Sequence, residues 1–173
     1  HYSPENAKSY CETNGLGDHF NVDFANQVAF YLQSLNGSGA FKYPLQNYHN
    51  VSSPYGYRYS PITGKYELHS GTDFPAPKGT PVLASMDGVV EKAEVMGGYG
   101  NCVVIRHNAK YKTYYAHNTS FDVSAGDTVK QGQVIAYVGS TGKSTGPHCH
   151  FEIRVNGKAV DAMPYLTNQT EIN

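Results

Sequence analysis

Residues 148–155 read His-Cys-His-Phe-Glu-Ile-Arg-Val and alternate between two kinds of side chain along their whole length. Successive side chains of a β-strand point to opposite faces of a sheet, so this alternation predicts a strand with two distinct faces. One face carries Cys149, Phe151, Ile153 and Val155, and the other carries His148, His150, Glu152 and Arg154. We expect the first face to build a hydrophobic core and the second to be free for chemistry.

Other short extended runs precede this strand, separated by Gly, Pro, Asn or Asp. They cover residues 82–84, 88–95, 101–107, 112–117 and 133–138. The composition agrees with many short strands and turns, since the chain has 18 Gly, 9 Pro and 15 Tyr and only 16% charged residues. The sequence therefore predicts a mainly β fold.

The first ~35 residues follow a different pattern, in which apolar side chains recur at the spacing of one helix face. These side chains are Phe20, Phe24, Val28, Tyr31, Leu32 and Leu35. Asp23 could cap the helix, and the Gly/Ser-rich residues 36–39 would end it as a flexible linker. We expect a helical prefix and linker over residues 1–40, one main domain over 41–166 and a tail over 167–173.

Bulk properties exclude some classes of partner. The 13 basic and 14 acidic side chains give a formal net charge of -1, which offers no reason to expect nucleic acid or an anionic membrane surface. No apolar run approaches the ~20 residues that span a bilayer, and the chain begins at His1 without a leader, so we expect no membrane insertion and a soluble piece, mature or cut from a longer protein. The three cysteines, Cys11, Cys102 and Cys149, support neither a disulfide framework nor a metal knuckle, and the last two are predicted to be buried.

A first metal-binding motif consists of His69 and Asp73, four residues apart. Gly71, Pro75 and a further proline make a helix unlikely to form here. A fully extended strand would place the pair about 13 Å apart, too far for one ion. The backbone must therefore bend at residues 70–72 for both side chains to reach a metal, and Gly71 permits a bend.

A second motif, His148-Cys149-His150, places two imidazoles on one strand face, roughly 6–7 Å apart at their Cα atoms. At that spacing one imidazole can bind an ion while the other reaches the water or substrate beside it. Two histidines and one aspartate leave a fourth position open, which is typical of a catalytic zinc site. The sequence thus predicts one zinc ion per chain.

Several ordered motifs together resemble the lysostaphin-like (LytM-type) zinc endopeptidases, over roughly residues 41–166. They are the string His69-Ser-Gly-Thr-Asp73-Phe-Pro-Ala-Pro-Lys-Gly-Thr-Pro-Val82, the triplet Tyr115-Ala-His117, the run Gly126-Asp-Thr-Val-Lys-Gln-Gly-Gln-Val-Ile135 and the string Ser140-Thr-Gly-Lys-Ser-Thr-Gly-Pro-His148-Cys-His150-Phe-Glu152. The resemblance implies a compact antiparallel β-sheet arranged as a barrel-like sandwich, with a groove over the metal. It also implies hydrolysis of peptide bonds in bacterial peptidoglycan.

Carried over by motif, the resemblance makes His69, Asp73 and His150 the zinc ligands and His117 and His148 the catalytic histidines. The chain departs from the usual pattern at Cys149, where a larger aliphatic residue is common. Because that side chain points into the predicted core, we expect a packing adjustment with little effect on the chemistry.

The chemistry can also be argued from the residues. Zinc would acidify a bound water and polarise the scissile carbonyl, and a neutral imidazole could accept the proton. The chain has no His-Glu-x-x-His helix to supply a glutamate base, so His117 and His148 are the candidates, and which one is the base stays open. Glu152 is interpreted as solvated or as a support to the ligands, and His107 as a turn residue. Five tyrosines in Gly-rich loops could line the groove, namely Tyr55, Tyr57, Tyr59, Tyr66 and Tyr99.

Three alternatives stay open at this stage. The chain could be a catalytically inactive peptidoglycan-binding or scaffold module of the same fold. Residues 127–133 look like part of a lipoyl or sugar-permease hybrid barrel, but such carriers lack the two histidine motifs together. Residues 2–10 and 17–18 faintly resemble the tail of a lysozyme-like module.

We accordingly expect a monomer or a piece of a larger multidomain hydrolase. Its place would be the cell wall outside the cell, or a virion if the chain derives from a phage. The bond cleaved, Gly-Gly in a bridge or one involving D-Ala, stays open.

Overall fold

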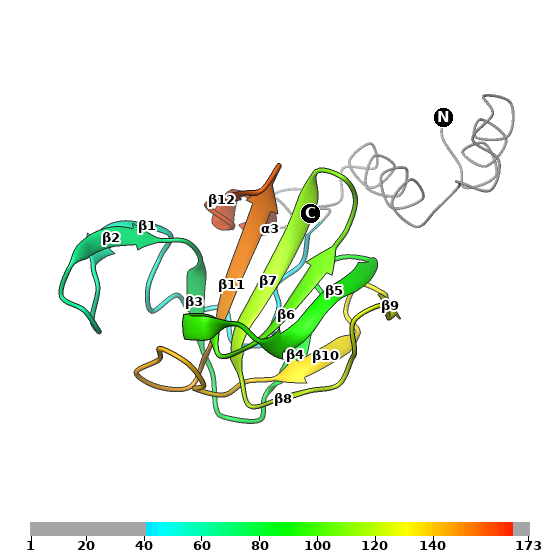
Figure 1. The fold of residues 1–173 in the computed structure, drawn as a ribbon, viewed down its shortest axis with the longest axis horizontal. Helices are drawn as coiled ribbons and strands as arrows, with labels where there is room; N and C mark the ends of the chain where they lie inside the picture. The colour runs from blue at the N-terminus through cyan, green and yellow to red at the C-terminus, as the bar shows by residue number, and fades with distance from the viewer. Residues whose placement is uncertain (1–40, 168–173) are drawn as a thin grey trace, which may run out of the picture.

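The computed structural model describes residues 41–167, and this part of the chain is built almost entirely of short antiparallel strands (Figure 1). The first strands are β1 (Gly56–Tyr59), β2 (Tyr66–His69), β3 (Thr72–Pro75), β4 (Pro81–Leu83), β5 (Gly88–Val95) and β6 (Asn101–Arg106). The later ones are β7 (Tyr111–Asn118), β8 (Ser120–Phe121), β9 (Thr128–Val129), β10 (Val134–Tyr137), β11 (His148–Val155) and β12 (Lys158–Val160). A 3₁₀ turn, η2 (Gly97–Tyr99), and a short helix, α3 (Met163–Thr167), complete the described residues.

The largest sheet among these residues has seven strands and is organised around β11. Its order is β12-β11-β7-β6-β5-β9, and β3 pairs with β11 beside that path. On one edge β11 pairs with β7, while its other edge pairs first with β3 and then with β12. Strand β11, which the sequence singled out, therefore pairs with three other strands. These pairings fix the direction in which each of its side chains points.

The hydrophobic core lies between this sheet and a second sheet of order β4-β10-β8. Alternate residues of each main-sheet strand point into it, among them Val103 and Ile105 of β6 and Cys149 and Phe151 of β11. The opposite face of the main sheet carries a smaller apolar cluster of Cys102, Val104 and Ala116. The functional residues described below lie on this second face.

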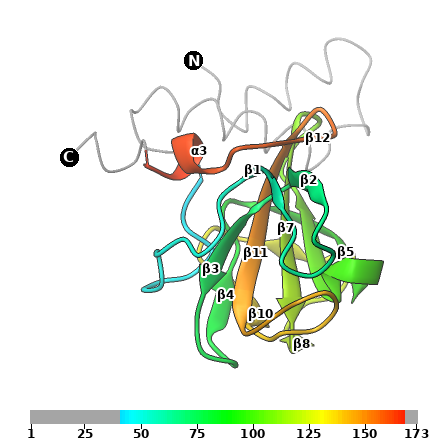
Figure 2. The ribbon, with the colours of Figure 1, turned by 90° about the vertical axis from the view of Figure 1, so that its left-hand side faces the viewer.

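Two strands form a hairpin of their own, β1 paired with β2. Figures 1 and 2 show that this hairpin and the loop that precedes β11 lie on the same side of the main sheet. Tyr57, Tyr59 and Tyr66 stand on the hairpin with mostly exposed side chains. The interpretation of these tyrosines as loop residues was therefore wrong, because strand pairing and stacking of the three rings order the segment.

The predicted mainly β, antiparallel fold is confirmed, and β5 and β11 have the predicted bounds. His107 does lie at the turn that follows β6, as interpreted, but its side chain is fully buried there and bonds Asp87 and Thr113. Cys102 and Cys149 are free and buried, as predicted. The helix expected in the first 35 residues, and Cys11, lie outside the described residues. No helix of the described part is long and apolar enough to cross a membrane.

Candidate metal centre

The bend predicted between His69 and Asp73 is present, and it brings the two side chains together. His69 ends β2, and β3 begins at Thr72, so the chain turns at Ser70 and Gly71. A Cβ atom at Gly71 would lie 2.6 Å from the carbonyl oxygen of Phe151 and 2.8 Å from the ring of His150. Glycine is therefore required at this bend because β11 passes directly against it.

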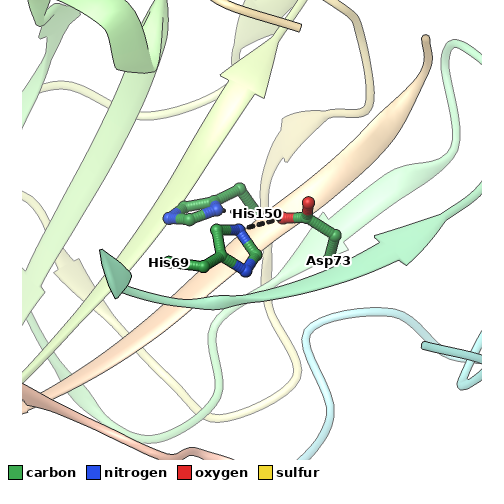
Figure 3. Close-up of side chains that lie close together, drawn as sticks. All are labelled: His69, Asp73 and His150. Atoms are coloured by element: carbon green, nitrogen blue, oxygen red, sulfur yellow. Dashed lines mark hydrogen bonds and ion pairs between the residues drawn. The ribbon is translucent and has the colours of Figure 1, made fainter. Parts of the chain in front are cut away.

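The third residue reaches the same place through strand register, since His150 of β11 stands directly opposite Asp73 of β3. Asp73 Oδ1 lies 2.9 Å from His150 Nδ1 and 3.3 Å from His69 Nε2 (Figure 3). One ligand atom from each of the three residues lies within 4.8 Å of the other two. Two imidazole nitrogens and one carboxylate oxygen at this separation fit a single zinc ion with an open fourth position.

The second nitrogen of each imidazole is already held by the protein, which strengthens that fit. His69 Nδ1 donates to the carbonyl oxygen of Pro54 at 2.9 Å, and His150 Nε2 bonds Glu152 Oε2 at 2.7 Å. Such bonds fix the orientation of the ring and leave the other nitrogen available to a metal. His69 thus presents Nε2 and His150 presents Nδ1.

The charges of the cluster suit a cation. Burial acts to raise the pKa of the Asp73 carboxyl, but hydrogen bonds from His150 and His69 outweigh burial and hold it far below its usual range. Burial acts to lower the pKa of His150, but the carboxylates of Asp73 and Glu152 raise it to about 9. Without a metal the His150 ring is therefore positively charged at neutral pH, with a proton on both nitrogens. A metal ion that binds Nδ1 must displace the proton on that nitrogen.

His117 and His148 lie beside this cluster, with ring centroids 4.8 Å apart. His117 donates from Nδ1 to the carbonyl oxygen of Thr141 at 2.7 Å, and His148 donates from Nδ1 to that of Gly146 at 2.8 Å. In both rings Nε2 is the atom left for proton transfer. His148 Nε2 lies 3.5 Å from Asp73 Oδ1, so the Nε2 edge of this ring points toward the cluster.

His117 has two further features of a functional residue. Burial lowers its pKa to about 4, so the ring is neutral at neutral pH and able to accept a proton. Its backbone is in the left-handed region, with φ of 63°, which is unusual for a residue with a side chain. Such strain is retained where the surrounding structure holds it, and it is concentrated at active sites.

The three residues of the cluster line an open groove of about 610 Å³. One wall comes from the β1–β2 hairpin, and the other from η2 and the loop before β11. The lining side chains beyond the five predicted site residues include Arg58, Tyr59, Thr63, Glu67, Tyr99, Lys143 and Ser144. Of the five tyrosines expected near the groove, Tyr59 and Tyr99 line it.

Of the two interpretations of Glu152, a solvated residue or a support to the ligands, the structure favours the second, although the sequence did not indicate how deeply it is buried. Its carboxylate is completely buried and bonds His150, Ser70 and Tyr99. Burial acts to raise the pKa of Glu152, but these partners lower it to about 2, so it is an anion. Its alternation with His148 and His150 did indicate the correct face, whereas the covering residue, Tyr99, comes from a turn that no pattern linked to β11.

Comparison with known proteins agrees with the geometry. Residues 67–162 match the family model described as Peptidase family M23. The peptidoglycan DD-endopeptidase ShyC of Vibrio cholerae is 50% identical over 100 residues, which are 58% of this chain and 23% of ShyC.

Two solved structures are similar as well. A zinc containing peptidase from Vibrio cholerae has a TM-score of 0.68 at 44% identity, covering 72% of this chain and 39% of that one. The catalytic domain of lysostaphin, an antimicrobial peptidase from Staphylococcus simulans, has a TM-score of 0.63 at 37% identity, covering 68% and 92%. The chain spans about a third or less of the length of the first curated relatives that it matches.

Proposed function

Because this chain belongs to peptidase family M23, a family of zinc metallopeptidases, we propose that it is a zinc endopeptidase that hydrolyses peptide bonds in bacterial peptidoglycan. The observation that carries the proposal is the cluster of His69, Asp73 and His150 in the lining of an open groove. His117 and His148 lie beside the cluster. An inactive binding module would not need these two histidines together with the three metal-binding residues.

In this proposal His69 Nε2, an oxygen of Asp73 and His150 Nδ1 hold the metal. When bound, zinc supplies Lewis-acid activation of water and of the scissile carbonyl. The protein supplies the proton transfers, because His117 is neutral and its Nε2 can accept a proton from the attacking water. His148 Nε2 lies close enough to hydrogen-bond the oxyanion or to return a proton to the leaving amine.

The substrate is the peptide part of peptidoglycan, and we propose a bond between D-amino acids of a cross-link as the one cleaved. The name of ShyC, a peptidoglycan DD-endopeptidase 50% identical to this chain, supports this choice. A Gly-Gly bridge is the alternative. Because peptidoglycan lies outside the cytoplasmic membrane, the proposed place of action is the cell wall, whether the enzyme is secreted or carried by a virion.

The test is digestion of two kinds of purified cell wall, one with direct cross-links and one with glycine bridges. The treated walls are then cut by a muramidase, and the muropeptides are identified by mass spectrometry. We expect new ends at the D-amino-acid cross-link and none after treatment with a strong chelator. The His150→Ala variant is the matched control. Glycine-bridge products alone would overturn the choice of bond, and a zinc-loaded protein that binds walls without cleaving any peptide bond in them would overturn the enzymatic function.

A further inference from the structure

The carboxylate of Glu152 is the point where several parts of the site meet. Its side chain is 0% exposed. Oε2 accepts hydrogen bonds from Ser70 Oγ, Tyr99 Oη and His150 Nε2, each at 2.7 Å. Oε1 bonds the guanidinium of Arg154, at 2.8 Å from Nε and 2.6 Å from Nη2.

These contacts reach both halves of the metal centre. Ser70 lies in the bend that connects His69 to Asp73, while His150 is the ligand that comes from β11. The bond to His150 Nε2 places the proton on that nitrogen and leaves Nδ1, which faces Asp73 Oδ1 at 2.9 Å, for the metal. One carboxylate thus orients a ligand ring and also holds the loop that carries the other two ligands.

The surroundings indicate that this arrangement is specific. Glu152 is on the face of the main sheet that carries the apolar cluster of Cys102, Val104 and Ala116. An aliphatic side chain in place of Glu152 would pack beside this cluster without the desolvation cost of a buried charge. A buried carboxylate is retained there only with a full set of partners. Arg154 supplies the opposite charge, and its guanidinium also bonds Tyr99 Oη and stacks over the ring of Tyr114.

We propose that Glu152 is the positioning residue of the metal centre, setting the tautomer of His150 and the place of the 69–73 bend. The inference rests on the proposed zinc site but concerns a residue that does not touch the metal or the substrate. Loss of Glu152 leaves the three ligands in the sequence and removes what aligns them. Zinc affinity should fall even though every ligand is retained.

The experiment compares the wild-type chain with Glu152→Gln, which keeps the size of the side chain and removes its charge. Zinc affinity is measured by competition with a chelator, and we expect Glu152→Gln to bind ~10–100-fold more weakly. The zinc-loaded proteins are also examined by NMR for the imidazole N–H of His150. In the wild type this proton should resonate far downfield because it bonds a carboxylate, and it should move upfield when an amide replaces that carboxylate.

Glu91→Gln is the matched control, since Glu91 is a carboxylate on β5 that pairs with Lys112 away from the metal centre. It should bind zinc like the wild type. If Glu152→Gln fails to fold, Glu152→Asp keeps the charge but withdraws it from His150, and it should bind zinc more weakly too. A folded Glu152 variant with wild-type zinc affinity and an unmoved His150 signal would overturn the inference. A wild-type chain that binds no zinc would instead overturn the proposed function.

Discussion

His148 and His150 are two residues apart on the same face of β11, but their ring nitrogens have different partners. His150 is anchored by Glu152 through Nε2 and presents Nδ1 to Asp73. His148 is anchored through Nδ1 by the carbonyl oxygen of Gly146 and presents Nε2. What separates them is the distance to the cluster: His150 Nδ1 lies 2.9 Å from Asp73 Oδ1 and belongs to the group of ligand atoms that fits one ion, whereas His148 Nε2 lies 3.5 Å from Asp73 Oδ1 and is left for proton transfer.

This difference predicts separate effects of two substitutions. His150→Ala leaves two protein ligands, so zinc binding, activity and zinc-dependent stability should be lost together. His148→Ala should keep about one zinc per chain and lose on the order of 10²–10⁴ in kcat, the range expected for a missing proton-transfer or oxyanion partner. His117→Ala should behave like His148→Ala.

The measurement is metal content and kcat of the three variants on one wall substrate, side by side. Zinc lost from His148→Ala but kept by His150→Ala would reverse the assignment within the motif. Zinc and activity kept by both would mean that the site is elsewhere.

At this scale the sequence predicted which residues share a face, but it could not predict how deeply they are buried. Alternation along β11 places Glu152 beside His150, and the structure agrees. Whether such a glutamate is solvated depends on what covers it. The cover is Tyr99, whose position follows from the turn η2 and from packing that has no periodic signal.

Among the elements, strands with an apolar face were the predictable ones. β5 and β11 have the expected bounds: β5 has buried side chains that alternate with less buried ones at its start, and β11 alternates apolar with polar residues although both kinds are buried from Cys149 to Ile153. β1 and β2 were missed because each has only four residues and almost none of their side chains is buried, so neither strand has the apolar face that indicates a core. β3 was missed because its short segment Thr72–Pro75 contains an aspartate and a proline, both rare in strands.

The β1–β2 hairpin forms one wall of the groove, which gives its tyrosines a testable role. Tyr59 lines the groove, whereas Tyr57, on the same strand, does not. Tyr59→Ser should raise KM for a wall peptide by roughly two- to tenfold, the equivalent of losing one aromatic contact of about 0.5–1.5 kcal/mol, with kcat unchanged. Tyr57→Ser is the matched control and should leave both constants alone. Steady-state kinetics that show equal changes in the two variants would assign the tyrosines to hairpin stability and not to substrate.

For the whole molecule, the buried His107 predicts how stability depends on pH. Burial lowers its pKa from 6.5 to about 4. The unfolded chain therefore binds the proton more readily, and the stability associated with His107 is complete above pH 6.5 and is lost as the pH falls toward 4. This loss is on the order of 3 kcal/mol.

The comparison is with His107→Gln, which cannot titrate, using urea unfolding of metal-free protein near neutral pH and in mild acid. The wild type should be the more stable protein at neutral pH, because its ring bonds both Asp87 and Thr113. That advantage should shrink in acid. A difference in unfolding free energy that does not change with pH would show that His107 takes up no proton on unfolding in this range.

The extent of the domain leads to the last prediction. All five predicted site residues lie between His69 and His150, and the core closes within the described residues 41–167. Phe41, the first described residue, belongs to this core: it is fully buried and packs edge-to-face against His107, Tyr111 and Tyr165. A chain that lacks residues 1–38 should thus keep the fold, the zinc affinity and the peptidase activity.

A deletion of only five more residues, 1–43, is the control that locates the boundary. It also removes Phe41 and the backbone bonds of Lys42 to Ser85, and loss of a buried phenylalanine alone costs about 3–5 kcal/mol. The melting temperature should be nearly unchanged in the first truncation and clearly lower in the second. If the first truncation folds and binds zinc but cleaves no cross-links in the wall, residues 1–38 contribute to the groove, and the boundary near residue 40 does not separate the prefix from the peptidase.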